Sequence, residues 1–139
     1  MQVFLPTVAI MPQWKISTEF NFSAAHYIPD YDGPCGRMHG HTYTVRLEAR
    51  SSQLHPSQFC PHAVMLADFR TLRWAKQDAL KGGLDHGVLN DLLPPDYATT
   101  AEMIAKFIYD RTKAKLPEGI QLKVAVSESP HSWAEYSDE

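Results

Sequence analysis

Residues Trp14 to Ala24 read WKISTEFNFSA, and their side chains alternate between two sets. The first set is mostly apolar and comprises Ile16, Thr18, Phe20, Phe22 and Ala24. The second set is polar and comprises Lys15, Ser17, Glu19, Asn21 and Ser23. Because successive side chains of a strand point to opposite faces, this alternation predicts a strand with one buried face and one face in water.

Residues 39–51, HGHTYTVRLEARS, repeat this pattern after a loop that contains several prolines and glycines. The loop runs from Tyr27 to about Met38. The side chains expected to face inward on the second segment are Tyr43, Val45, Leu47 and Ala49. Two alternating segments joined by a loop of breaker residues are typical of antiparallel neighbours, so we expect these two strands to pair.

Helical spacing appears in the second half of the chain. Apolar residues recur at helical intervals from Phe69 to Leu80, and we expect Asp68 to cap this helix and Gly82 and Gly83 to end it. These apolar positions are Phe69, Leu72, Ala75, Ala79 and Leu80. They predict one face of the helix to be buried against the sheet.

A second helix is expected to start near Thr99, because Thr99 and Glu102 have the spacing of a capping box. Its expected buried stripe comprises Ile104, Ala105, Phe107 and Ile108. We interpret residues 51–63 as a long connection. Further strands are predicted at residues 64–67, 121–128 and 133–136. The inward positions of the long one are Leu122, Val124 and Val126.

The predicted order of elements is strand, strand, helix, helix, strand, strand. Such an order indicates the α+β class, with an antiparallel four-stranded sheet and two helices on one face. We expect a single domain over residues 1–139, with residues 1–13 as an N-terminal extension. A small sheet with one covered face leaves exposed edges, so we also expect self-association.

Composition excludes several classes of function. The formal net charge is -3, which gives no overall basic surface for nucleic acid. No apolar run approaches the roughly 18 residues of a membrane span, and the first twelve residues lack the positive region of a secretory signal. Two cysteines do not make a disulfide framework, so we expect free thiols and a cytoplasmic location.

Three histidines are predicted to converge at one end of the inward face. His39 and His41 are two residues apart and therefore share a face, and His26 continues the inward series of the first strand. Neutral imidazole is a good ligand for zinc, and three protein ligands leave one position of a tetrahedron open. The sequence therefore predicts a catalytic zinc site at His26, His39 and His41.

Cys35 lies in the loop between these histidines, and spacing alone leaves two roles open. It could be a fourth zinc ligand that closes a structural site. It could instead be a free thiolate beside the metal, with its pKa lowered by the local positive charge. These alternatives predict different proteins, because a closed site leaves no position for a substrate.

Two further acidic residues, Asp85 and Glu128, are candidates for catalysis or ligand binding. The adjacent pair Asp85 and His86 follows the glycines that end the first helix and could form a proton relay. Glu128 shares the inward face of its strand with Val126, where a carboxylate is costly unless it has a partner. Its two oxygens could accept two N–H donors from a planar, guanidine-like edge of a ligand.

Taken together, these residues resemble the 6-pyruvoyl-tetrahydropterin synthase superfamily, and within it the bacterial 6-carboxy-tetrahydropterin synthases of queuosine biosynthesis. The resemblance covers about residues 16–136. The matching segments are FSAAH at 22–26, CGRMHGH at 35–41, DF at 68–69, LDH at 84–86, LN at 89–90, TAE at 100–102, and Glu128. The three residues that separate Cys35 from His39 resemble the carboxy-forming type.

The resemblance implies a tunnelling fold, in which subunits join their sheets into a barrel, usually as a homohexamer with active sites between subunits. It implies zinc on the three histidines, with Cys35 as a proton-accepting thiol and Asp85 and His86 as a relay. Glu128 would anchor the pterin ring, and Thr100 and Glu102 would also contact the substrate.

The implied reaction is that of a zinc-dependent lyase. It converts 7,8-dihydroneopterin triphosphate into 6-carboxy-5,6,7,8-tetrahydropterin, acetaldehyde and triphosphate. Two alternatives share the same residues. One is a 6-pyruvoyl-tetrahydropterin synthase, which stops after elimination of triphosphate. The other is a zinc protein that binds a pterin without catalysis, and it predicts a closed four-ligand site.

Overall fold

The computed structural model describes residues 12–138, and the first eleven residues of the expected extension lie outside this range. Its main sheet has the order β1-β2-β5-β6, and all neighbours are antiparallel. The strands are β1 (Trp14–His26), β2 (His39–Ser51), β5 (Gln121–Ser129) and β6 (Ser132–Ser137). The predicted antiparallel four-stranded sheet is therefore confirmed, and β1 and β6 are its two edges.

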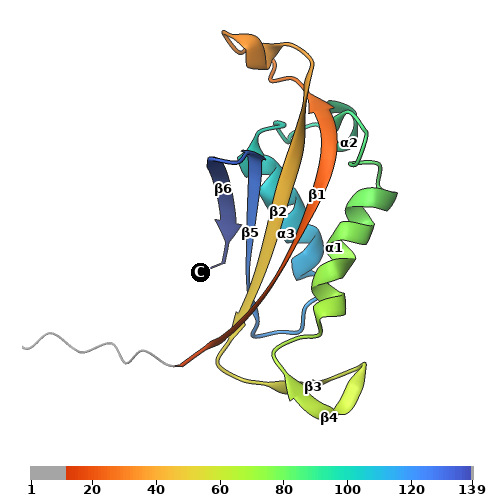
Figure 1. Ribbon diagram of the computed structural model, residues 1–139, viewed down its shortest axis with the longest axis vertical. Coiled ribbons are helices and arrows are strands. Elements are labelled where there is room, and N and C mark those ends of the chain that lie inside the picture. Colours follow the sequence, from red (N-terminus) through yellow and green to blue (C-terminus); the bar gives the residue numbers. More distant parts are fainter. Residues whose placement is uncertain (1–11, 139) are drawn as a thin grey trace, which may run out of the picture.

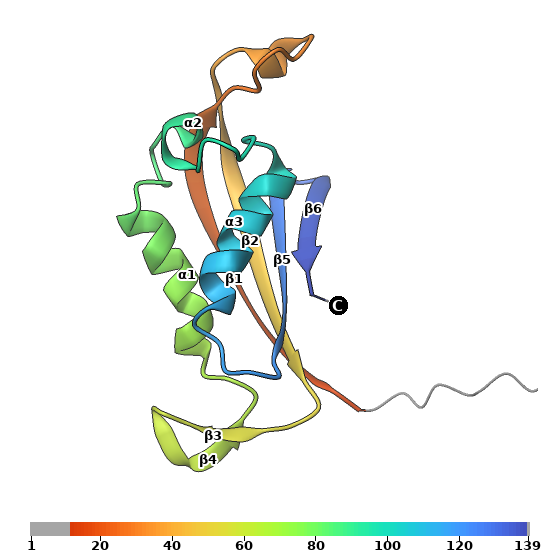
Figure 2. The same cartoon turned by 180° about the vertical axis from the view of Figure 1, so that it is seen from behind.

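The helices all cover one face of this sheet, as Figures 1 and 2 show from opposite sides. They are α1 (Phe69–Lys81), the single turn α2 (Leu89–Leu92) and α3 (Ala101–Lys113). None of the helices in residues 12–138 is long and apolar enough to cross a membrane. The α+β architecture with helices on one face is as predicted, and α2 is an addition that is too short to produce a periodic pattern.

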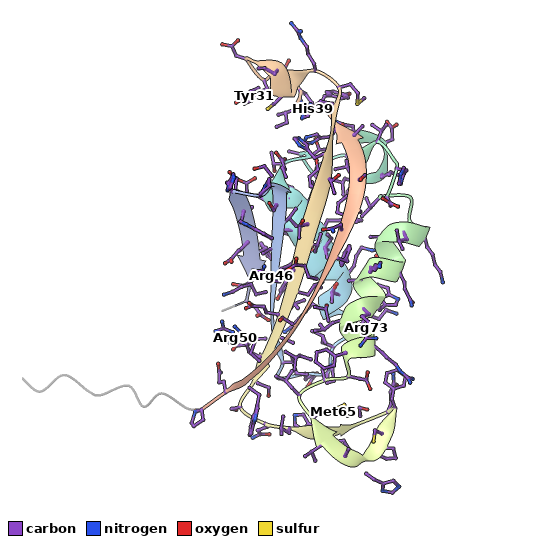
Figure 3. All side chains as sticks on the ribbon, in the orientation of Figure 1. Tyr31, His39, Arg46, Arg50, Met65 and Arg73 are labelled. Carbon is purple, nitrogen blue, oxygen red and sulfur yellow. The ribbon has the colours of Figure 1, made fainter. Side chains whose placement is uncertain are left out.

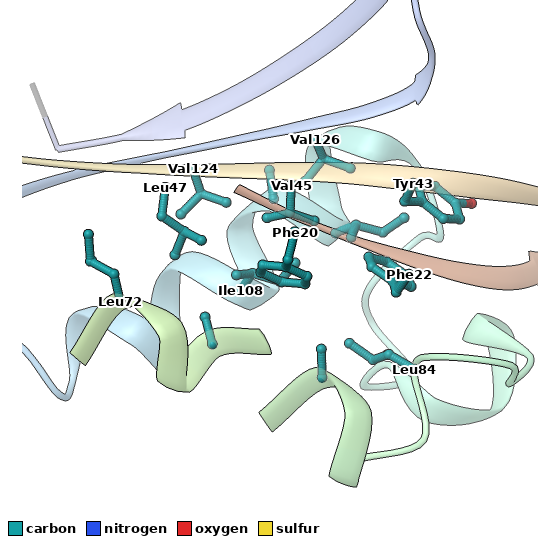
Figure 4. Close-up of a cluster of buried hydrophobic side chains, with 14 of the residues drawn as sticks. Phe20, Phe22, Tyr43, Val45, Leu47, Leu72, Leu84, Ile108, Val124 and Val126 are labelled. Carbon is teal, nitrogen blue, oxygen red and sulfur yellow. The ribbon is translucent and has the colours of Figure 1, made fainter. Parts of the chain in front are cut away.

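The core lies between the sheet and the helices (Figure 4). Tyr43, Val45 and Leu47 of β2 are completely buried, and so are Leu72 of α1 and Ile104 of α3. The inward positions predicted for β1, β2 and β5 are buried or half-buried. The predicted stripe of α1 is buried in its middle, but its ends, Phe69 and Leu80, are exposed.

The helix caps confirm one prediction and correct another. The Asp68 carboxylate accepts a hydrogen bond from the N–H of Arg70 at 2.8 Å, as expected for the cap of α1. The cap of α3 is Thr100 and not Thr99, because the Thr100 hydroxyl accepts from the N–H of Met103. Thr99 is buried, and its hydroxyl donates instead to the carbonyl of Tyr27 at 3.0 Å.

The segment expected to be an irregular connection contains a hairpin. It consists of β3 (His55–Ser57) and β4 (Cys60–Met65), which pair with each other outside the main sheet. The strand predicted at residues 64–67 is confirmed only at Val64 and Met65, because β4 begins earlier, at Cys60, and ends at Met65. Both strands of the hairpin are mostly exposed, so neither shows the alternation from which a buried face can be predicted.

Candidate functional site

The pairing of β1 with β2 brings the predicted histidines together. His26 lies directly opposite His39, and His41 is two residues further along the same face. The ring centroids of His26 and His39 are 4.6 Å apart, and those of His39 and His41 are 4.7 Å apart. One potential ligand atom from each of the three residues lies within 4.8 Å of the others. The spacing is compatible with a shared metal ion.

Backbone carbonyl groups fix the orientation of two of the rings. Nδ1 of His26 lies 2.7 Å from the carbonyl oxygen of Thr99, and Nδ1 of His39 lies 2.6 Å from that of Arg37. A carbonyl oxygen only accepts, so each Nδ1 carries the proton and each Nε2 keeps its lone pair. Ligating histidines typically use their second nitrogen in this way.

The free nitrogens fit a metal better than any partner the chain supplies. Within residues 12–138, Nε2 of His26 and Nε2 of His41 are buried and make no hydrogen bond. Burial lowers the pKa of His26, against the opposing effects of the Thr99 carbonyl and the Glu128 carboxylate. The neutral form of imidazole, which is the form that binds metals, is thereby favoured.

Glu128 projects toward the same histidines from the end of β5. Its carboxylate oxygens lie 3.8 Å from Nε2 of His41 and 4.0 Å from Nε2 of His26. The sheet register shifts between Ser127 and Ser129, so Glu128 sits at a bulge. Glu128, Thr100 and Glu102 line one cavity of about 260 Å³, which opens beside the histidines. The three predicted substrate-binding residues thus share a single cavity.

Asp85 and His86 lie on a segment that runs beside β1 at the edge of the sheet. The N–H of Ala25 donates to the carbonyl of Gly87 at 2.9 Å, and the N–H of Ser23 donates to the Asp85 carboxylate at 2.9 Å. The Ser23 N–H lowers the pKa of Asp85; partial burial opposes this, and His86 lowers it further. Asp85 is therefore an anion held in place by the backbone of β1.

His86 completes the pair. Its Nδ1 lies 3.0 Å from the Asp85 carboxylate, while 81% of its side chain is exposed. Its backbone is left-handed, with φ 64°, which is uncommon for a residue other than glycine. Gly87 is required at the next position, because a Cβ there would lie 2.1 Å from the Gly83 carbonyl oxygen. His86 and His41 line a shared hollow of about 480 Å³.

Cys35 lies apart from the converging ligand atoms. It belongs to a 3-10 turn, Pro34–Gly36, in the loop that projects beyond the ends of β1 and β2 (Figure 1). Its carbonyl accepts a hydrogen bond from the N–H of Ile28 at 2.8 Å, and its thiol is free and half-buried. Among the described residues, the group that could hold a metal comprises the three histidines without Cys35.

Comparison with known proteins identifies the family. A family model described as 6-pyruvoyl tetrahydropterin synthase matches residues 15–139. The chain belongs to this family. The 6-carboxy-5,6,7,8-tetrahydropterin synthase of Synechocystis is 34% identical, over 88% of this chain and 92% of the relative. The human 6-pyruvoyl tetrahydrobiopterin synthase is 27% identical, over 91% of this chain and 93% of the relative. The chain is thus an enzyme of the 6-pyruvoyl tetrahydropterin synthase family.

Solved structures confirm the fold of the family. The 6-pyruvoyl tetrahydropterin synthase of Caenorhabditis elegans superposes with a TM-score of 0.72 and 22% sequence identity. The match covers 95% of this chain and all of that one. The predicted fold class of this family member is therefore confirmed.

Three groups in the site of this family member escape sequence reasoning. Two are the carbonyls of Thr99 and Arg37, because any residue type supplies a carbonyl and no pattern marks its use. The third is the Tyr43 hydroxyl, which is buried beside the rings of His26 and His41 and has no hydrogen-bond partner in residues 12–138. Burial, with a smaller effect of Glu128, raises the pKa of Tyr43, so the hydroxyl stays protonated. Tyr43 was predicted only as an inward-facing core residue.

Proposed function

We propose that this enzyme is a zinc-dependent lyase of queuosine biosynthesis. It would convert 7,8-dihydroneopterin triphosphate and water into 6-carboxy-5,6,7,8-tetrahydropterin, acetaldehyde and triphosphate. The observation that carries this proposal is the convergence of His26, His39 and His41 beside a carboxylate-lined cavity. The 34% identity to a relative named for this product supports it.

The three histidines fit zinc because their donor atoms are neutral imidazole nitrogens with two orientations already fixed. When bound, zinc supplies a Lewis acid that polarises the hydroxyl groups of the substrate side chain. Three protein ligands leave a coordination position for those hydroxyls. Cys35 lies outside the ligand group, which favours an open catalytic site over a closed structural one.

The cavity beside the histidines suits the pterin ring. The Glu128 carboxylate can accept two parallel N–H bonds from the amino group and ring nitrogen of a pterin. Thr100 and Glu102 line the same cavity, where their side chains can contact the rest of the ring. A ring held at Glu128 would place its side chain near the histidines, because Nε2 of His41 and Nε2 of His26 lie 3.8 Å and 4.0 Å from the Glu128 carboxylate.

We assign proton transfer to the Cys35 thiol and to the relay formed by Asp85 and His86. Cys35 would remove and return protons at the carbons of the substrate side chain. Asp85 accepts from Nδ1–H of His86, which leaves Nε2 as the nitrogen that exchanges a proton with the substrate. Ser23 holds Asp85 through its backbone N–H, so the imidazole keeps one orientation relative to β1.

Within residues 12–138 of one chain, His86 shares a hollow with His41 but lines no cavity with Glu128, which supports an active site completed by a second subunit. Asp85 and His86 lie along the β1 edge, whereas the Glu128 cavity includes Ser132 and Trp133 of β6, the opposite edge. Joining the β1 edge of one subunit to the β6 edge of the next brings the relay to the cavity and closes the sheets into a barrel. We therefore propose a homohexamer with intersubunit sites.

The alternative product is the 6-pyruvoyl pterin, formed by elimination of triphosphate without loss of acetaldehyde. Identity favours the carboxy-forming reaction, at 34% against 27% for the human 6-pyruvoyl relative. The three-residue spacing between Cys35 and His39 favours it as well.

Product analysis separates these reactions. Zinc-loaded protein is incubated with 7,8-dihydroneopterin triphosphate, and the pterin, acetaldehyde and triphosphate are identified by chromatography and mass spectrometry. We expect acetaldehyde and the 6-carboxy product in equal amounts. Triphosphate with a 6-pyruvoyl product would establish the alternative reaction. No turnover by protein with zinc bound would contradict both.

A further inference from the structure

A third cavity lies far from the histidines, at the end of the molecule that carries the β3–β4 hairpin (Figures 1 and 2). It is a groove of about 400 Å³ between the outer face of α1 and the turn of the hairpin. Figure 3 labels Arg73 of α1, which lines the groove. The residues that matter here are Phe59, Arg70, Arg73, Trp74, Gln77 and Lys115.

The groove carries positive charge that the described part of the chain does not neutralise. Arg70, Arg73 and Lys115 make no ion pair within residues 12–138. The two nearest carboxylates along α1 are already engaged. Asp68 accepts from the backbone of α1, and Asp78 forms a two-bond pair with Arg111. The chain as a whole has a net charge of -3, so this local excess of cations stands out.

Aromatic rings hold two of these cations in the groove. The Arg70 guanidinium lies over the Phe59 ring at 4.8 Å, and the Lys115 ammonium lies over the Trp74 ring at 4.9 Å. Phe59 is 44% exposed, so part of its ring is accessible to a ligand in the groove. Exposed rings beside guanidinium groups are the combination that binds a planar base and its phosphates.

We infer that this groove binds a nucleoside polyphosphate. The base would stack on Phe59 or Trp74, and the phosphates would accept hydrogen bonds from Arg70 and Arg73. The volume is in the range of small-molecule sites. The groove and the histidine cluster lie at opposite ends of the long axis, so the two sites would be occupied independently (Figure 1).

Titration calorimetry with the zinc-loaded protein tests the inference, using ATP, GTP and inorganic triphosphate as probes. We expect micromolar binding of at least one nucleotide and at least tenfold weaker binding of inorganic triphosphate. The double variant Arg70→Gln/Arg73→Gln should weaken nucleotide binding at least tenfold. The matched control Lys81→Gln, at the far end of α1, should leave it unchanged.

Because the proposed substrate also has a planar ring and a triphosphate, Glu128→Gln serves as a second control. This variant alters the other cavity, and nucleotide binding should not change. Loss of nucleotide binding in Glu128→Gln would overturn the inference, since the ligand would then occupy the active site. The absence of binding at 1 mM nucleotide would also overturn the inference, because enzymes typically reach half-saturation with their substrates at or below about 1 mM. Equal affinity for inorganic triphosphate would overturn it as well.

Discussion

Two backbone carbonyls, those of Thr99 and Arg37, determine which nitrogen of His26 and His39 is available in the site. They link the histidine cluster to parts of the chain outside the two strands. Thr99 precedes α3, and Arg37 ends the loop that contains Cys35. Movement of either segment would therefore change the orientation of a histidine ring in the cluster.

At the residue scale, the proposed role of the Cys35 thiol can be tested separately from the binding of zinc. We expect Cys35→Ala to retain its full zinc content and to lose at least a hundredfold in kcat, a loss typical of a missing acid–base group. The other cysteine offers a matched control, since Cys60 lies in the β3–β4 hairpin. Cys60→Ala should keep both zinc and turnover. Loss of zinc from Cys35→Ala would show that Cys35 is a ligand and that its assignment as a base is wrong.

The alternation of side chains between the two faces of each strand was sufficient to predict the three-histidine cluster. His39 and His41 had to share a face, and His26 had to lie on the inward face of its partner strand. The position of Glu128 beside them could be predicted only in part. Its face follows from parity, but its distance from the histidines depends on the pairing of β5 with β2, which no local pattern specifies. Whether the residues share one active site stays a prediction.

At the scale of elements, the start of α3 combines a structural and a proposed functional role. The Thr100 hydroxyl caps the helix and also lines the Glu128 cavity. Thr100→Ala should lower the free energy of unfolding by about 1 kcal/mol, as loss of a cap does. Thr100→Ser retains the oxygen and is the matched control. Chemical denaturation measures the difference, and equal stability of the two variants would contradict the capping role.

The end of β6 is tied to α3 and β5 by Asp138. Its carboxylate contacts the Lys113 ammonium at 2.6 Å and accepts from the N–H of Leu122 at 3.0 Å. Partial burial acts to raise the pKa of Asp138, but Lys113, Leu122 and the hydroxyl of Tyr109 together lower it. A lowered pKa means that the folded protein favours the anion, so stability is gained above the pKa of the unfolded chain and lost as pH falls.

Asp138→Asn should therefore lower the free energy of unfolding by about 1–2 kcal/mol at pH 7, as expected for hydrogen bonds to a charged group. The difference from the native sequence should begin to shrink as the pH falls below about 4, the ordinary pKa of an aspartate, and should be lost as the pH falls through the lowered pKa of the folded carboxyl. Urea denaturation at pH 7 and pH 3 measures it. Asp96→Asn, at an exposed position, provides the control. A deficit at pH 3 as large as that at pH 7 would contradict the electrostatic explanation.

The elements with a buried face were predictable, whereas the exposed β3–β4 hairpin was not. The helix α1 follows from its apolar spacing and its cap, both of which are local features. The hairpin β3–β4 has little buried surface, so the sequence gives no indication of which residues pair. The cap of α3 was predicted at Thr99 and lies at Thr100, and this difference also could not be predicted from a local pattern. Both threonines have a hydroxyl, and only the tertiary contact of Thr99 with Tyr27 decides between them.

At the scale of the whole molecule, the proposed assembly makes use of the two edges of the sheet. Ser23 and Ala25 direct their N–H groups away from β2, to Asp85 and Gly87. Since N–H directions alternate along a strand, the N–H of Glu19 also points out from the β1 edge. In residues 12–138, no backbone partner lies beside that part of β1, so its hydrogen-bonding groups are available to a second subunit.

Glu19→Pro should weaken the assembly without unfolding the subunit, because proline removes an outward N–H and leaves the β1–β2 pairing intact. We expect a shift from hexamer to smaller species in light scattering coupled to gel filtration. Glu19→Ala removes the same ion pair with Arg46 but keeps the N–H, so it should remain a hexamer. A hexameric Glu19→Pro variant would show that this edge is not an interface.

The measurement that tests the central claim most directly is the zinc content of His41→Ala, determined together with product formation in the same samples. His55→Ala is the matched control, since His55 lies in the hairpin away from the cluster. With two ligands left, His41→Ala should retain less than about a tenth of the zinc and form no product, given the 10- to 100-fold losses that even weaker perturbations cause. Full zinc content with unchanged product formation in His41→Ala would contradict the three-histidine metal site.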